Sequence, residues 1–266
     1  MRKIRDIGRA SVSKKTERAL WSVASVAVGL AIIGLWQYIA WQKYVSPVFL
    51  PGPDRAWSAL LEGFESGALT ERTLATVERM AYGWVLASVL GVAIGALIGS
   101  SRVARQYLGP TLEFIRPLPA SAMIPVAIAF FGLTKSMVLG VIAFGSIWPM
   151  LLATIHGFAS VEPRLIEVAR VLKLTRLEFI FKIALPNSMP DIFAAMRLGL
   201  TIALILSVVG EILAFQGGLG SHILEASRSF RSAELFAGVI LLGIIGLLSN
   251  LALGALESRL LRWRSQ

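Results

Sequence analysis

The chain alternates between long uncharged stretches and short charged segments. Five stretches of 18 residues or more carry no formal charge, at 19–42, 80–101, 117–134, 136–161 and 235–256. A sixth apolar stretch, 192–215, is interrupted only by Arg197 and Glu211. About 20 apolar residues at the helical rise cross a bilayer core, and buried soluble helices rarely repeat at this length. The pattern therefore predicts an all-α integral membrane protein with six transmembrane helices.

The charges outside these stretches are distributed unequally between the two sides. With the N-terminus in the cytoplasm, seven Lys and Arg precede the first stretch, two separate the second from the third, five separate the fourth from the fifth, and three follow the sixth. These 17 inner basic residues compare with seven on the outer side, which about as many acids offset. The positive-inside rule then places both termini in the cytoplasm. The net charge of +10 is an orientation signal, and we expect no nucleic-acid partner.

The first stretch is predicted to be a retained helix rather than a signal peptide. It is longer than a signal core of roughly 7–15 residues, and no small-x-small cleavage site follows it. It closes on an aromatic cluster typical of a membrane interface, which comprises Trp36, Tyr38, Trp41 and Tyr44. The predicted organisation is a basic cytoplasmic segment (1–18), the first helix (19–42), an outer segment with an amphipathic helix (43–79), the transmembrane core (80–258) and a basic cytoplasmic tail (259–266).

Small residues and charges stand out inside two spans. Gly91, Gly95 and Gly99 form a stripe on one face of the second span, which indicates close packing within the bundle or, alternatively, a dimer seam. Arg197 lies near a cytoplasmic helix end, where its long side chain can reach water. Glu211 lies deeper, so its carboxylate should face the bundle or a wet cavity. We interpret Glu211 either as a hydrogen-bonding group at the outer helix end or as part of an outer gate.

The third span is unusual in its prolines. Pro117, Pro119 and Pro125 each remove a backbone donor and bend a helix. Irregular backbone at membrane depth persists only beside protein or a water-filled cavity. We therefore expect this span, with Ser121, Met123 and Pro125, to lie near a translocation pathway; the alternative is that the kinks have no role in transport.

The loop between the fourth and fifth spans, 162–186, is predicted to form two short helices. The first carries an apolar stripe at i, i+3, i+4 and i+7, which consists of Leu165, Val168, Ala169 and Leu172. A polar edge runs beside the stripe and consists of Glu167, Arg170 and Lys173. Thr175 and Glu178 have capping-box spacing, which predicts a second helix from about Arg176. A short amphipathic helix of this kind lies on lipid or inserts its apolar side into a partner.

This loop carries a recognisable motif. Glu167-Val-Ala169, followed after a gap by Ile183-Ala-Leu-Pro186, resembles the EAA loop in the membrane subunits of bacterial ABC importers. The segments FIRPLPASAMIPVAIAFFGLTKS, VEPRLIEVARVLK and GEILAFQGGLGSHILEASRSF are similar to the nitrate/sulfonate/taurine branch of these permeases. The resemblance covers roughly residues 45–262. The chain differs from the family at Val168, where alanine is usual, and at Lys173, where the family has glycine; a left-handed turn at this lysine would cost about 1 kcal/mol.

The resemblance implies a type I ABC importer permease fold in the bacterial inner membrane. In that family the loop forms a cytoplasmic coupling helix, here near 163–173, which docks on the ATP-hydrolysing subunit. The implied coupling residues are Leu165, Glu167, Val168, Ala169, Arg170, Leu172 and Lys173. The implied partners are two ATPase subunits, a second copy of the permease, membrane lipid, and a periplasmic or lipid-anchored substrate-binding protein.

We predict no catalytic site, metal site or cofactor in the chain itself. No Gly-Lys dipeptide occurs, so a Walker A loop is missing and ATP and Mg would be bound by the partner ATPase. The two histidines, His156 and His222, lie far apart without carboxylates at ligand spacing. One alternative is a standalone channel or secondary transporter, which leaves the helix pair unused. Another is a membrane-embedded enzyme, for which Glu211 is the single suitable titratable group. The resemblance favours a small solute, either an organic anion such as a sulfonate or taurine, or one like nitrate or bicarbonate.

Overall fold

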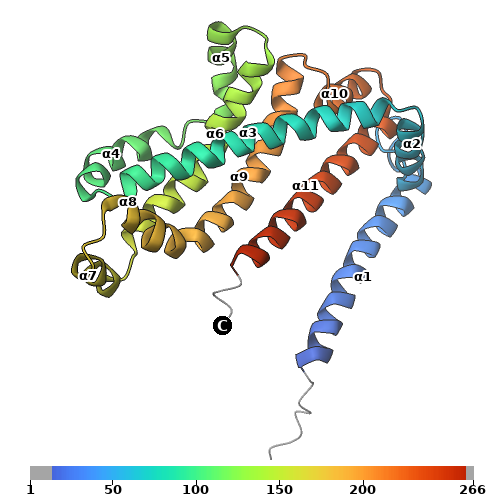
Figure 1. Cartoon of the computed structure of the whole chain (residues 1–266). Helices are drawn as coiled ribbons and strands as arrows, with labels where there is room; N and C mark the ends of the chain where they lie inside the picture. The colour runs from blue at the N-terminus through green and yellow to red at the C-terminus, as the bar shows by residue number, and fades with distance from the viewer. Residues whose placement is uncertain (1–13, 262–266) are drawn as a thin grey trace, which may run out of the picture.

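The structure, a computed structural model, describes residues 14–261, which form helices joined by short turns (Figure 1). Residues 1–13 and 262–266 lie outside the described residues, and they include most of the predicted segments 1–18 and 259–266. The α-helices are α1 (Lys14–Trp41), α2 (Pro53–Glu65), α3 (Ala68–Gly99), α4 (Arg102–Ile115), α5 (Ile124–Phe131), α6 (Lys135–Ala159), α7 (Pro163–Val171), α8 (Arg176–Phe179), α9 (Leu185–Leu213), α10 (Leu219–Arg228) and α11 (Ser232–Leu260). A 3₁₀ turn, η1 (Ala120–Met123), and a π-helical turn, η2 (Ile180–Ala184), complete the set.

Five of the described helical segments are long and apolar enough to cross a membrane, namely α1, α3, α6, the run from α8 to α9, and α11. The pair formed by α4 and by η1 with α5 is bent by 82° at its junction and makes a sixth crossing when the two parts are counted as one span. Five of the six predicted spans are therefore confirmed, and the third predicted span is not one helix over 117–134. Pro117 and Pro119 lie at the break, where each withholds the backbone N–H that a continuous helix requires. Residues 102–115, which were expected to form an inner loop, are helical instead.

The central layer consists of α3, α6 and α9, each in contact with the other two. The stripe of Gly91, Gly95 and Gly99 faces α6, where these residues allow the two backbones to approach closely. A Cβ atom on Gly95 would lie 2.7 Å from Cβ of Thr154 and 2.8 Å from the carbonyl oxygen of Leu151. Since carbon atoms make favourable contact at about 3.5–4.0 Å, an alanine does not fit here without movement. The stripe serves packing within the chain, and the dimer-seam alternative is wrong.

Polar contacts connect α9 to α3 and to α11. The indole Nε1 of Trp84 in α3 donates a hydrogen bond to the carbonyl oxygen of Met196 in α9, at 3.0 Å. Arg197 forms an ion pair with Glu257 near the end of α11, and both side chains are partly exposed. The predicted position of Arg197 near a water-accessible helix end is consistent with this partial exposure.

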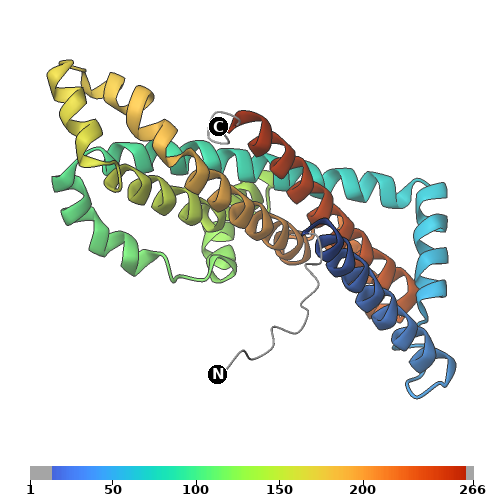
Figure 2. The same ribbon diagram turned by 90° about the horizontal axis from the view of Figure 1, so that it is seen from below.

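The remaining helices lie around the central layer. In Figure 1, α11 lies between α9 and α1, and α1 stands apart with its apolar side chains exposed along its length. The start of α1, the end of α11 and α7 all lie toward the lower part of that view, whereas α2 and α10 lie toward the upper part. Seen from below, α4 and α5 lie toward one end of the central layer and α1 lies toward the other end (Figure 2). The arrangement therefore separates a lower end, which carries α7, from an upper end, which carries α2 and α10.

Candidate functional site

The helix α7 presents an apolar surface outward from the lower end of the molecule. Pro163 begins the helix, where the missing N–H of a proline costs nothing. Leu165, Val168 and Leu172 are 39%, 48% and 64% exposed, and Val171 is exposed beside them. We call these four side chains the α7 outer face. The helical spacing in the sequence predicted Leu165, Val168 and Leu172. It did not predict Val171, which falls outside the i, i+3, i+4, i+7 positions.

The opposite side of α7 is occupied within the chain. Ala169, which was expected to be part of the exposed apolar stripe, is only 7% exposed. Ile166 packs against a buried cluster made by Phe158, Val161 and Ala184. One apolar side of α7 therefore packs against the rest of the protein, and the other faces outward. The expectation that Ala169 belongs to the outward-facing apolar stripe is wrong. Glu167 and Arg170 are exposed, as their place on the polar edge requires.

The turn after α7 is closed by Lys173 in the left-handed region, with φ of 50°. The backbone N–H of Leu174 donates to the carbonyl oxygen of Ala169 at 3.0 Å, and that of Lys173 donates to Arg170 at 3.0 Å. These two bonds form a Schellman motif, in which glycine usually holds the left-handed position. The turn at Lys173 therefore needs the conformation that the family's glycine supplies, and lysine adopts it at a steric cost.

The second short helix begins with the predicted capping box, which is confirmed. The hydroxyl Oγ1 of Thr175 accepts from the backbone N–H of Glu178 at 3.3 Å, and Glu178 accepts from the backbone N–H of Thr175 at 2.9 Å. Lys182 holds the same carboxylate at 2.9 Å. The second short helix was predicted to end at Pro186, where the loop 162–186 ends. In the structure, α8 instead continues through η2 into α9. Pro186 has no N–H and its ring crowds the carbonyl four residues back, so Leu185 bonds instead to Ile180, five residues back.

A buried ion pair lies near the upper end of α9. Glu211 is fully buried, and Arg79 of α3 donates to its Oε1 at 2.7 Å. The second oxygen accepts from the backbone N–H of Gly220 at 2.8 Å, while Arg79 also donates to the carbonyl oxygen of Gly217 at 2.5 Å. Gly218 has to be glycine, because a Cβ atom there would overlap the Glu211 carboxylate. We call these five residues the outer clamp, which joins α3, α9 and the turn before α10.

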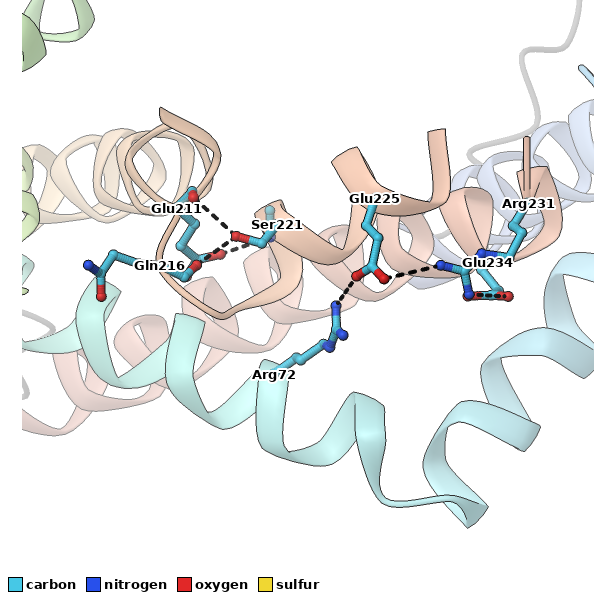
Figure 3. Close-up of polar contacts among 8 residues, drawn as sticks. Arg72, Glu211, Gln216, Ser221, Glu225, Arg231 and Glu234 are labelled. Carbon is cyan, nitrogen blue, oxygen red and sulfur yellow. Dashed lines mark hydrogen bonds and ion pairs between the residues drawn. The ribbon is translucent and has the colours of Figure 1, made fainter. Parts of the chain in front are cut away.

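Side-chain bonds on both sides of the outer clamp fix the same turn. The hydroxyl of Ser221 donates to the carbonyl oxygens of Glu211 and Gln216, at 3.0 and 2.6 Å (Figure 3). On α3, the hydroxyl of Thr76 accepts from the backbone N–H of Leu219 at 2.9 Å. The carboxylate of Glu211 thus has the hydrogen-bonded environment that the structural interpretation predicted. The sequence did not reveal Arg79 as its partner, because the two residues are 132 positions apart. A role of Glu211 in an outer gate stays a prediction.

A separate series of exposed ion pairs lies beside these contacts on the upper surface (Figure 3). Arg72 of α3 bonds Glu225 of α10 at 3.2 Å, Arg231 bonds Glu225 at 3.4 Å, and Arg231 bonds Glu234 at 2.8 Å. The hydrogen bond from Arg72 holds the pKa of Glu225 below its usual value. Burial lowers the pKa of His222, on the same helix, and the Arg72 charge lowers it further. These ion pairs connect α3, α10 and α11 on the upper surface.

The predicted pathway residues of the third span lie away from the outer clamp. Ser121 and Met123 belong to η1, and Pro125 lies in the first turn of α5. Ser121 and Pro125 are exposed, and no hydrogen bond among the described residues links any of the three to Glu211. Within residues 14–261, no group of His, Asp and Glu side chains is arranged to hold a metal ion.

Long apolar crossings, inward-facing basic loops and an exposed helix on the cytoplasmic side define a polytopic membrane permease that works with a partner. More particularly, the chain belongs to the family described as binding-protein-dependent transport system inner membrane component, whose sequence model matches residues 87–264. It is therefore the multi-pass inner membrane permease subunit of an ABC importer and is not itself the catalytic component. Such a system implies an ATPase and a substrate-binding protein as partners. Membership of this family sets aside the alternatives of a standalone transporter and of a membrane enzyme.

Relatives and solved structures agree with this assignment. The chain is 33% identical over 256 residues to SsuC of Bacillus subtilis (strain 168), named for aliphatic sulfonates transport, with 96% of this chain and 93% of SsuC covered. It is 29% identical to the nitrate import permease protein NrtB of Leptolyngbya laminosa, with 90% and 87% covered. It is 28% identical to the taurine transport system permease protein TauC of Escherichia coli (strain K12), with 92% and 90% covered.

The fold of the chain is similar to those of solved ABC transporters. The MetNI methionine transporter in an inward-facing conformation matches with a TM-score of 0.63 at 18% identity, covering 72% of this chain and 95% of the other. An amino acid ABC transporter matches with a TM-score of 0.58 at 19% identity, covering 76% and 97%. At this level of identity the likeness concerns the fold, and it confirms the predicted ABC importer permease fold.

Proposed function

We propose that α7 is the coupling helix of this permease and that the α7 outer face docks on the ATPase subunit. The observation that carries the proposal is the exposure of Leu165, Val168 and Leu172 on one side of a short helix at the cytoplasmic end. Burying exposed aliphatic side chains against a partner yields about 25 cal/mol for each square ångström removed from water. Glu167 and Arg170, at the edge of this face, are placed to set the orientation of docking by charge.

The connection from α7 to the membrane supports a mechanical role. The Schellman motif at Lys173 and the capping box at Thr175 leave few free torsions between α7 and α8. From α8 the helix continues through η2 into α9, whose upper end carries the outer clamp. A displacement of α7 by the ATPase would therefore be passed to α9 along one continuous helical path. The chain converts closure of the ATPase, which binds ATP and Mg, into a change of access to the pathway.

For the assembly, we propose two copies of this chain, each bound to one ATPase subunit, with the substrate-binding protein at the upper end. The pathway then lies between the copies, near Ser121, Met123 and Pro125. Ser121 and Pro125 are exposed in the single chain, as residues beside a shared pathway would be.

For the solute, we propose a small anion whose charged group bears three oxygens. SsuC is named for aliphatic sulfonates, NrtB for nitrate and TauC for taurine, which is itself a sulfonate. All three names therefore share a compact three-oxygen anionic group. Titration of the partner binding protein with a sulfonate, nitrate and an uncharged analogue tests the proposal, and binding of the uncharged analogue alone would contradict it.

The coupling role is tested by the substitution Leu172→Asp. A carboxylate at the C-terminal end of the α7 outer face should abolish solute-stimulated ATP hydrolysis, because an unpaired charge would be buried at the interface. Membrane insertion should be unaffected, since Leu172 is well exposed in the permease itself. The measurement is ATP hydrolysis by the reconstituted complex with and without the loaded binding protein.

The matched control is Leu177→Asp, which places the same charge on the exposed side of α8. Stimulated hydrolysis should survive in this control if α7 alone provides the docking surface. Full stimulation in the Leu172→Asp variant would contradict the docking role of α7.

A further inference from the structure

A groove lies between α7, α8 and the lower end of α3, on the opposite side of α7 from its outer face. Its volume is about 230 Å³. The apolar walls are formed by Ile166, Ala169, Leu174 and Phe179, and two arginines, Arg170 and Arg176, stand at its edge. We call this the basal groove.

Neither arginine at the edge of the basal groove is neutralised by a carboxylate. Among the side chains that the structure describes, no ion pair joins an acid to Arg170 or to Arg176. Two acids of the same loop pair elsewhere, Glu178 with Lys182 at 2.9 Å and Glu162 with Arg164 at 3.8 Å. The third, Glu167, forms an ion pair with neither arginine. No acidic residue lines the groove. Two positive charges therefore converge on an apolar recess without a counter-ion from within the described chain.

We infer from the end of α3 that the basal groove lies near the inner bilayer surface. Ser100, which ends the membrane-crossing helix α3, forms part of its lining. Arg105 follows in α4 and donates a hydrogen bond to the carbonyl oxygen of Gly99. A cytoplasmic leaflet with anionic lipids carries negative charge at this level, and basic recesses between helices on this side attract its headgroups.

The size of the recess restricts what can enter it. An α-helix from a partner protein has a diameter of about 10 Å with side chains, which a volume of about 230 Å³ cannot accommodate. A flexible hydrocarbon chain, which is a row of methylene groups, can lie along the narrow apolar wall. An occupant that combines a negative headgroup with such a row matches both the charge and the shape of the groove.

We propose that the basal groove binds an anionic phospholipid of the inner leaflet. Its phosphate is held by Arg170 and Arg176, and the first carbons of one acyl chain lie against Ile166, Ala169 and Leu174. The bound lipid supports the underside of α7 while the α7 outer face remains free for the ATPase. The proposal assigns Arg170 to lipid in addition to its expected place at the edge of the docking surface.

The experiment compares lipid retention by the purified full chain, using native mass spectrometry with added phosphatidylglycerol or phosphatidylcholine. We expect selective retention of phosphatidylglycerol by the wild type. The double variant R170Q/R176Q should bind phosphatidylglycerol about tenfold or more weakly, because each basic group near an anionic surface contributes about a fivefold factor in affinity. The control R164Q/K173Q removes the same charge from the same loop outside the groove and should retain the lipid.

A second variant tests the apolar part of the site. Ser100→Trp leaves both arginines in place and inserts a ring into the recess from the exposed end of α3, so lipid retention should fall here too. Equal retention of the two lipids by the wild type, or unchanged retention in R170Q/R176Q, would overturn the proposal. Loss of stimulated ATP hydrolysis in R170Q/R176Q with lipid retention intact would instead assign the arginines to the ATPase. This readout is independent of Leu172→Asp, so failure of either proposal is recognised separately.

Discussion

Four residues that are not glycine follow helix ends in the left-handed conformation, and three of them, Lys173, Phe215 and Phe230, with φ of 50°, 52° and 55°, share one hydrogen-bond pattern; the fourth is Lys43. Each of the three follows the helix cap, and the next backbone N–H bonds back to a carbonyl five residues earlier, as Gln216 does to Glu211 at 3.2 Å. Their side chains do not favour this conformation, so the hydrogen bonds and the surrounding packing impose it. These are positions where single substitutions report directly on local strain.

At Lys173 we predict that Lys173→Gly stabilises the folded permease by up to about 1 kcal/mol. Glycine removes the steric cost of a left-handed residue, and part of the gain is lost to its greater freedom in the unfolded chain. Thermal unfolding in detergent measures the change. Lys173→Ala is the control, because it deletes the charge and keeps the strain; an equal gain in this control would show that charge, not backbone conformation, is responsible.

At Glu211 we predict that Glu211→Gln lowers the free energy of unfolding by about 3 kcal/mol. The substitution leaves the guanidinium of Arg79 enclosed without its counter-charge, and breaking one side of a buried pair is strongly destabilising. Arg72→Gln is the control, since its pair with Glu225 is exposed and such pairs contribute at most about 1 kcal/mol. A Glu211→Gln variant that melts like the wild type but no longer transports would favour the gate over the clamp.

At the scale of the elements, α3, α6 and α9 depend on small residues where their backbones meet. The glycine stripe of α3 lies on α6, and a Cβ atom on Gly199 of α9 would lie 2.6 Å from the sulfur of Met150 in α6. In a bilayer, apolar side chains gain nothing by leaving lipid for protein, so close backbone approach and dispersion hold such helices together. The packing is therefore sensitive to single methyl groups.

For the α3–α6 contact we predict that Gly95→Ala costs about 1–3 kcal/mol, the usual range for overpacking. The added methyl group meets the Leu151 carbonyl oxygen, which belongs to the backbone and cannot turn aside. Gly34→Ala in α1 is the control, because nothing lies within 4 Å of its Cβ position. Detergent melting temperatures compare the two, and an equal change in both would show that the close approach is not what stabilises α3 on α6.

At the scale of the whole molecule, much of the apolar surface faces outward. Side chains along α1 are exposed, and so are Val126, Phe130 and Phe131 of α5. Lipid covers such surface at no cost, so exposure alone does not identify a partner interface. The two regions differ in that α5 is the last part of the broken third span, in which Ser121 and Met123 are expected to border the pathway.

For the assembly we predict that α5 lies near its copy in the second subunit. The chain contains no cysteine, so Phe130→Cys, at a position 80% exposed, introduces the single thiol. Oxidative cross-linking in membranes should give a covalent dimer, whereas Leu30→Cys on α1 should remain monomeric. A cross-link from Leu30→Cys and none from Phe130→Cys would place α1 at the interface instead.

The sequence by itself determined five long apolar crossings, the capping box at Thr175 and the existence of α7, and it predicts the orientation. These depend on charge-free length, on the asymmetry of Lys and Arg, and on spacing within one or two helical turns, all of which are local along the chain. Only the tertiary structure decided that Arg79 partners Glu211, that Ala169 faces inward, and that Arg170 and Arg176 share one groove. Those features arise where elements distant in sequence meet, and the periodicity of one helix shows which sides are apolar without showing which neighbour covers each side.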